Sequence, residues 1–214
     1  FTFLNDTTGL ESPNIIAFQL LKSNQFKYEY INRISDFYNS LFKPENVIEQ
    51  IDSIKNIIAN DIYFETERWD SDTLTWRNNI QSIKTYAINR QNVVKQQLTN
   101  YFSLQEEGEI ILESTAGGYI KLNSISINNF PWSGHYFKNI PIHIEAIPNP
   151  GYIFKEWEFE QIYQNPITIS LASNSTYLSA IFVPENTNND IDIITPSTNA
   201  NDNFHPIIFK YYYQ

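Results

Sequence analysis

Glycine is confined almost entirely to one stretch of this chain. Five of the six glycines lie between Gly108 and Gly151, and residues 1–106 contain only Gly9. Apolar residues recur every three or four positions before Glu107 and alternate with polar residues after it. The first spacing is typical of amphipathic helices and the second of half-buried strands. The sequence therefore predicts an α+β fold in two segregated parts, an N-terminal all-α helical bundle and a C-terminal small antiparallel β domain.

The same distribution bears on function. Phosphate-binding loops and nucleophile elbows need glycine where the backbone approaches a ligand or turns sharply. The helical part has almost none. If the chain belongs to an enzyme, we expect much of the active site to lie outside it.

Composition excludes several classes of partner and chemistry. The 214 residues carry a formal net charge of −10, which disfavours nucleic acid and anionic lipid as partners. The absence of cysteine removes disulfides, thiolate nucleophiles and zinc ribbons. No apolar run reaches about 18 residues, so we expect no membrane span. Because methionine is also absent, we expect the chain to be a processed or truncated piece of a longer protein.

Four helices are predicted in residues 1–106. The first begins at Ser12-Pro13, a cap followed by proline at the first helical position. Asn24 can cap the second, which Lys43-Pro44 ends, and Pro44 opens the third. Asp70 or Ser71 caps the fourth, which runs toward Phe102. Each helix has a one-sided apolar stripe, so the helices should pack as antiparallel neighbours.

Six short strands are predicted in residues 107–185, and turn residues separate them. This pattern is typical of a sandwich-like or grasp-like β domain. Residues 186–214 have the Asn/Thr/Pro-rich composition of a linker, ending in an apolar segment that is either a tail or the start of a further unit. The strands are expected at 109–113, 119–122, 141–146, 152–157, 167–171 and 177–182. The expected core aromatics are Tyr136, Phe137, Tyr152, Phe154, Trp157 and Phe182.

Two polar groups in the helical part are candidates for chemistry. Residues 65–72 carry four carboxylates that could ligate calcium or magnesium, although an acidic corner between helices accounts for them better. Arg68, Trp69 and Arg90 are candidate structural or positioning residues, for an anionic ligand or for a buried carboxylate or carbonyl.

The β part offers fewer candidates. His135, His143 and His205 show no metal-ligand spacing, and no catalytic triad pattern is present. Trp132, Tyr136 and Trp157 are candidate exposed aromatics that could form a surface for stacking on sugars, whereas core packing is the default for aromatics at alternating positions. The sequence thus predicts no catalytic, cofactor-binding or metal-binding residue.

An ordered series of short matches in the helical part resembles the C-terminal helices of CotH-type kinases, the spore-coat-protein-H family and its secreted bacterial relatives. No single match is diagnostic, but together they cover about the first 105 residues. The matching segments are 18–27, 30–33, 41–45, 51–54, 67–69, 83–90 and 101–104, with Trp76, Val94 and Leu98.

The β part looks like a divergent bacterial surface repeat of the internalin B-repeat kind. Asn139 stands where that repeat usually has glycine, a substitution that positive φ allows for asparagine. The resemblance rests on residues 117–123, 132–137, 144–148, 151–157 and 180–182. A helical kinase end followed by such a repeat resembles the arrangement in large secreted proteins of Bacteroidetes-like bacteria.

The CotH resemblance implies a secreted or cell-surface kinase that uses ATP and a divalent metal, Mg²⁺, to phosphorylate proteins. The family's nucleotide-binding lysine and metal-binding aspartates lie upstream of the matched helices. The resemblance therefore implies a C-lobe scaffold whose partner is the upstream kinase lobe of the same polypeptide, with no cofactor bound by this fragment. The alternative is a non-enzymatic cell-surface protein that binds a glycan or a protein. A pseudokinase is a third, weaker alternative. Whether the two halves pack together or swing about residues 105–108 stays open.

Overall fold

The computed structural model describes residues 14–158 and 162–185, and the predicted segregation into helices and sheets is confirmed. The expected linker and final apolar segment at 186–214 lie outside the described residues. The helices are α1 (Asn14–Leu20), α2 (Asn24–Tyr38), α3 (Pro44–Ile58), α4 (Ile62–Arg68) and α5 (Thr73–Phe102). The strands are β1 (Glu107–Ser114), β2 (Gly118–Leu122), β3 (Ile125–Ile127), β4 (Trp132–Phe137), β5 (Pro141–Pro148), β6 (Tyr152–Trp157), β7 (Ile167–Ser170) and β8 (Ser175–Pro184).

The helix ends follow local chemistry, with two corrections to the predicted caps. Ser23, not Asn24, caps α2 by accepting a hydrogen bond from the backbone N–H of Phe26. Asp72, not Asp70 or Ser71, caps α5, because Asp72 has the extended backbone that a cap requires. Asp70 instead has φ 49°, in the left-handed region. Helix α5 ends at Ser103, also left-handed, with φ 53°.

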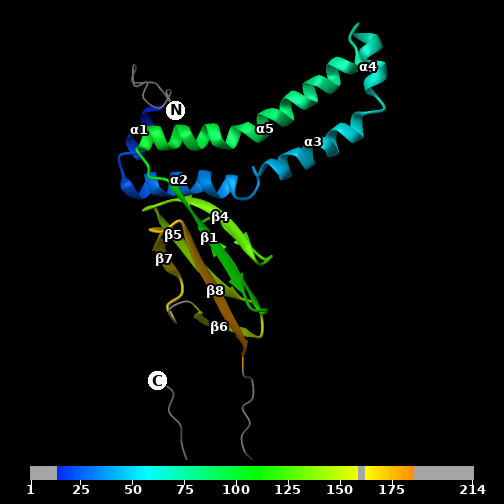
Figure 1. Ribbon diagram of the computed structural model, residues 1–214. Coiled ribbons are helices and arrows are strands. Elements are labelled where there is room, and N and C mark those ends of the chain that lie inside the picture. Colours follow the sequence, from blue (N-terminus) through cyan, green and yellow to red (C-terminus); the bar gives the residue numbers. More distant parts are fainter. Residues whose placement is uncertain (1–13, 159–161, 186–214) are drawn as a thin grey trace, which may run out of the picture.

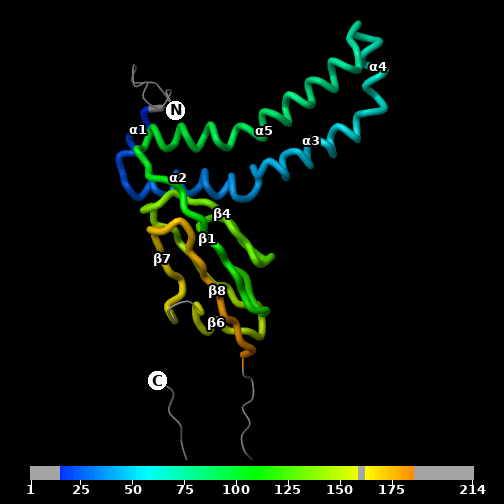
Figure 2. Tube along the Cα trace, in the orientation of Figure 1, coloured from blue at the N-terminus to red at the C-terminus, as the bar shows by residue number. Residues whose placement is uncertain are grey.

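The long helix α5 organises the helical part (Figure 1). Helix α2 lies along its C-terminal half and α3 along its N-terminal half, while α4 forms the far tip (Figure 2). Neither α3 nor α4 has a fully buried residue. None of the helices in the described ranges combines the length and apolar character needed to span a bilayer.

The β part is a sandwich of two four-stranded sheets, with strand orders β4-β1-β8-β6 and β3-β2-β5-β7. Most neighbouring strands are antiparallel, but β1 and β8 pair in parallel, with Ile110 opposite Thr176 and Leu112 opposite Leu178. Side chains from the facing sides of both sheets form one core. Its fully buried members include Ile110, Leu112, Ile120, Leu122, Tyr136, Ile142, Ile144, Trp157 and Ala180.

Two strands are additions to the six predicted. Strand β3 is only three residues long, so it shows too little alternation to detect. Strand β4 contains Ser133, Gly134 and His135, which were interpreted as turn chemistry. Gly134 occupies a strand because a side chain there has no room: a Cβ would lie 2.4 Å from the Trp132 ring and 3.0 Å from Cγ of Asn39.

Candidate functional site

Helix α2 lies between α5 and the β sandwich, so it makes two different contacts (Figure 1). Its apolar side, centred on Ile31, packs against Val94 and Leu98 of α5. Its other side carries Asn32, Asp36 and Asn39, spaced by four and three residues and therefore on one face of the helix. This polar stripe meets the β sandwich and forms the most elaborate polar site in the described residues.

Asp36 is at the centre of the stripe and is fully buried, with an exposed fraction of 0%. One carboxylate oxygen accepts hydrogen bonds from the Tyr136 hydroxyl at 2.9 Å and from the Asn123 amide at 3.3 Å. The other accepts one from the Ser124 backbone N–H at 3.0 Å and a short one from the Ser124 hydroxyl. Four donors to one carboxylate offset the cost of burying it without a cation.

Tyr136 is the partner that fixes this carboxylate from the sandwich core. Burial raises the pKa of the Tyr136 phenol well above its ordinary value of 10.0, and the neighbouring charge of Asp36 raises it further. The phenol therefore keeps its proton at any physiological pH, and its hydroxyl donates a hydrogen bond to Asp36.

Asn39 and Asn32 extend the contact by bonding to backbone rather than to side chains. The Asn39 amide donates to the His135 carbonyl at 2.7 Å and accepts from the His135 N–H at 2.9 Å. It thus pairs with edge strand β4 as a neighbouring peptide unit would. The Asn32 amide donates to the Pro141 carbonyl at 2.7 Å. Because Asn32 and Asn39 bond to backbone atoms, these contacts depend on where the strands lie more than on the side chains of the strands.

Apolar and ionic contacts complete the joint between the halves. Phe137, the last residue of β4, and Ile140, which lies shortly after it, join Ile31 and Leu98 in a second core. Lys95 of α5 forms a 2.6 Å ion pair with Glu107 at the start of β1. Asn139, in the turn after β4, adopts φ 61°, a left-handed conformation that asparagine tolerates. The two halves therefore pack together rather than swing about residues 105–108.

The structure does not bring Arg68, Trp69 and Arg90 together. The Arg68 guanidinium lies over the Trp69 ring at 5.6 Å, at the far tip, where Trp69 is 66% exposed. Arg90 lies over the ring of Tyr86, 5.7 Å from its centroid. It is 17 residues into α5, about 25 Å along the helix from its start. The two arginines thus occupy separate surfaces.

The predicted aromatic platform for sugars is wrong for two of its three members. Tyr136 and Trp157 are fully buried in the sandwich core, where alternation places them on the inner faces of β4 and β6. Trp132 is half-buried beneath Lys43, whose ammonium group is 6.0 Å from the ring centroid. The core interpretation of Tyr136 and Trp157 is the correct one.

Two of the four carboxylates in residues 65–72 have local structural partners. Asp72 accepts hydrogen bonds from the backbone N–H and the hydroxyl of Thr75, both at 2.7 Å, and the backbone bond leads in lowering the pKa of Asp72. Glu67 accepts one from the Tyr63 hydroxyl. In residues 14–158 and 162–185, no three His, Asp or Glu side chains are grouped to hold a metal ion. His135 and His143 are exposed, and His205 lies outside the described residues.

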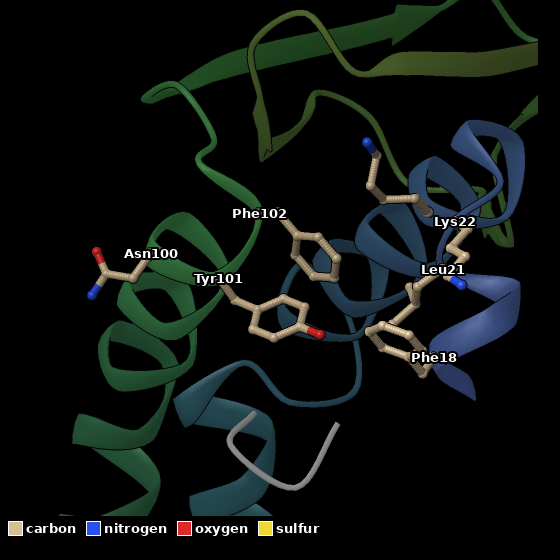
Figure 3. A pocket seen from close by; sticks show the side chains of 7 residues that line it. Phe18, Leu21, Lys22, Asn100, Tyr101 and Phe102 are labelled. Carbon is tan, nitrogen blue, oxygen red and sulfur yellow. The ribbon is translucent and has the colours of Figure 1, made fainter. Parts of the chain in front are cut away.

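Hollows in the surface border the helices. One of about 470 Å³ separates α1 from the end of α5, where Figure 3 shows Tyr101 and Phe102 pointing toward Phe18 and Leu21. Another, of about 480 Å³, lies beside the polar stripe and is lined by residues that include Arg33, Asn123 and His143. Because the oxygens of Asp36 are engaged by four donors, this carboxylate is suited to joining the halves and not to proton transfer.

Sequence reasoning missed the polar stripe, because its spacing alone does not distinguish it from a helix face in contact with water. Asn32, Asp36 and Asn39 share one face of a helix whose other positions were assigned to an apolar stripe. Three polar residues on one face ordinarily indicate solvent. Only the partners, about 90 to 110 residues later in the chain, show that this face is buried.

Comparison with known proteins places part of the chain beside a known family. Residues 6–94 match the family model described as CotH kinase protein. Among the described residues the match covers α1 to α4 and α5 as far as Val94, and it includes no strand. No curated protein and no solved structure matches the chain. The resemblance of the helical part to CotH-type kinases is thus found independently, whereas no comparison reaches the β sandwich.

Proposed function

We propose that this chain is the C-terminal part of a secreted CotH-type protein kinase, supplying scaffold helices of the C-lobe and an accessory β module. The match of residues 6–94 to the CotH kinase family carries this proposal, because it coincides with the helical elements. The proposed role is structural: the helices support a catalytic site that other parts of the kinase domain contain.

The surface of the outer helices supports this role. Ile54 and Ile58 of α3 and Ile83 and Tyr86 of α5 are exposed, although each belongs to an apolar stripe. A helix pair with such a face gains stability when another element covers it. The face fits helices that are part of a larger domain.

The residues present do not fit the nucleotide and metal of a kinase. Phosphoryl transfer needs a phosphate cradle and Mg²⁺ held by carboxylates or amides. The helical part has a single glycine, Gly9, and two of the four carboxylates in residues 65–72, Glu67 and Asp72, are engaged in a local hydrogen bond and a helix cap. We therefore assign ATP and Mg²⁺ to the remainder of the kinase and no catalytic step to this chain.

We further propose that the β sandwich is an internalin B-repeat-like module that acts at the bacterial cell surface. Its fixed attachment through Asp36 and Asn39 suits a module that holds the kinase at a set orientation to a protein or glycan. A non-enzymatic adhesion protein built from the same two parts is the alternative.

The proposal is tested by the intact mass of the native protein from its source, compared with 25.1 kDa for this chain. A larger native protein that transfers the γ-phosphate of ATP to secreted proteins, and that loses the activity when this chain is deleted, is the expected result. A native protein of 25.1 kDa that binds a surface glycan or protein would establish the alternative instead. The isolated chain is expected to show no transfer in either case, and it serves as the negative control.

A further inference from the structure

A groove between α2, α3 and α5 combines apolar walls with one cation, Arg90, that has no ion-pair partner among the described residues. A hollow of about 300 Å³ is lined by Tyr38, Phe42, Val47, Ile83, Tyr86, Ala87 and Arg90. A second of about 280 Å³ adjoins it and shares Tyr38, Phe42 and Arg90. Arg90 therefore stands between two apolar hollows.

Arg90 has an aromatic contact but no ionic one. Its guanidinium lies over Tyr86, and no ion pair or hydrogen bond involves it in the described part of the chain. By contrast, Lys84 on the same helix is paired, with a 2.6 Å ion pair to Asp52. An arginine that is partly buried among apolar side chains has five donors suited to a carboxylate.

Ile83, Tyr86 and Arg90 follow one another at three- and four-residue spacing, so they form a single stripe on α5. Ile83 is 53% exposed and Tyr86 60% exposed. A helical segment lying in the groove would thus meet apolar side chains first and a cation two turns further along. The complementary segment has apolar residues on one face and a carboxylate about seven positions away.

We propose that this groove, here called the Arg90 groove, binds an amphipathic polypeptide segment whose carboxylate pairs with Arg90. Its source is the remainder of the same kinase domain, a statement that rests on the proposed function. Charge complementarity identifies the occupant. The chain as a whole has a net charge of −10 and would attract basic segments, but the groove presents only a cation.

Two synthetic amphipathic helices of about 18 residues, identical except for Glu or Lys beside the apolar face, serve as probes. The Glu peptide should bind the intact 214-residue chain about tenfold more tightly than it binds Arg90→Gln, by fluorescence anisotropy. Arg77→Gln, an exposed arginine earlier on α5, is the charge-matched control and should bind like wild type. Circular dichroism verifies that each variant is folded. Equal affinity for wild type and Arg90→Gln, or a preference for the Lys peptide in wild type, overturns the groove assignment.

A photo-crosslinking residue in place of Tyr86 in the native protein tests the source. A crosslink within the same polypeptide supports the proposal, and a crosslink to a second copy or to another protein overturns the assigned source. These experiments distinguish a failure of the groove assignment from a failure of the proposed function. If the native protein proves to be this chain alone, the kinase proposal and the assigned source both fail, while the peptide measurement still reports on the groove.

Discussion

The hydroxyl of Tyr136 on β4 donates a 2.9 Å hydrogen bond to the carboxylate of Asp36 on α2, 100 residues earlier in the chain. Both groups are fully buried. This bond connects a helix that belongs to the CotH match with a sandwich that lies outside it. The two halves are therefore joined by a buried contact, and its contribution to the free energy of unfolding can be measured.

Asp36→Ala is expected to destabilise the chain by about 3 kcal/mol, because it leaves Tyr136, Asn123 and Ser124 with buried donors that lack an acceptor. Urea unfolding followed by circular dichroism measures the change. Asp61→Ala is the control, since Asp61 is exposed and makes no side-chain cap bond. A loss below about 0.5 kcal/mol in Asp36→Ala, as expected for a surface residue, contradicts the joint.

Stability should fall at alkaline pH through Tyr136. Its pKa is raised in the folded state, so folding favours the protonated phenol. The stabilisation is complete below the ordinary pKa of 10.0 and is lost as pH rises above it, by up to about 1.4 kcal/mol per pH unit for one group. Tyr136→Phe should be less stable at pH 7 but show a shallower decline above pH 10. Unfolding curves between pH 7 and 11 decide this, and equal slopes in the two proteins count against it.

Gly134→Ala should disturb the pairing of Asn39 with β4. The added Cβ would meet the Trp132 ring at 2.4 Å and Asn39 at 3.0 Å, so one of them must move. We expect a loss of about 2 kcal/mol, comparable with overpacking a core. Gly151→Asn is the matched control, because nothing lies within 4 Å of that position and asparagine tolerates its φ of 82°. In thermal unfolding, a lower melting temperature for Gly151→Asn than for Gly134→Ala would contradict this prediction.

The contact between α3 and α5 should weaken in acid. Asp52 has a lowered pKa, chiefly through its hydrogen bond with Lys84 and then through Lys55. Its stabilisation is present above the ordinary value of 3.8 and is lost as pH falls through the lower folded value. In Lys84→Met, hydrogen exchange of α3 should be faster at pH 7 and change less between pH 5 and 2 than in wild type. Arg77→Met removes a charge from the same helix without an ion pair and should leave this dependence unchanged.

The elements that local spacing determines were predictable from sequence, and those set by distant partners were not. Pro44 marked the start of α3, and the alternation around Ile142 and Ile144 marked β5. Strand β4 was missed because Gly134 in the sequence indicates a turn. Only the structure shows that glycine is needed there because Asn39 and Trp132 leave no room for a side chain. The parallel pairing of β1 with β8 was also missed, since spacing within a strand contains no information about its neighbour's direction.

The candidate site was less predictable than the fold. Arg90 was identified from sequence as a positioning candidate, but its lack of a counterion depends on which side chains surround it. Asp36 was not identified, because a single aspartate in a helix carries no signal of burial. Tyr136 was assigned to the core correctly, and only its hydroxyl partner was unforeseen.

The anchoring of α2 also determines where the far end of α5 lies. Helix α5 has 30 residues and is about 45 Å long, and it is fixed near its C-terminal end by Val94, Leu98 and Lys95. The helix thus behaves as a lever whose pivot is the joint with the sandwich. A rotation of about 5° at the pivot moves the start of α5 by about 3 Å, because roughly 33 Å of helix lies between Lys95 and that end. The place of Trp69 at this tip is therefore set by residues at the opposite end of the helix.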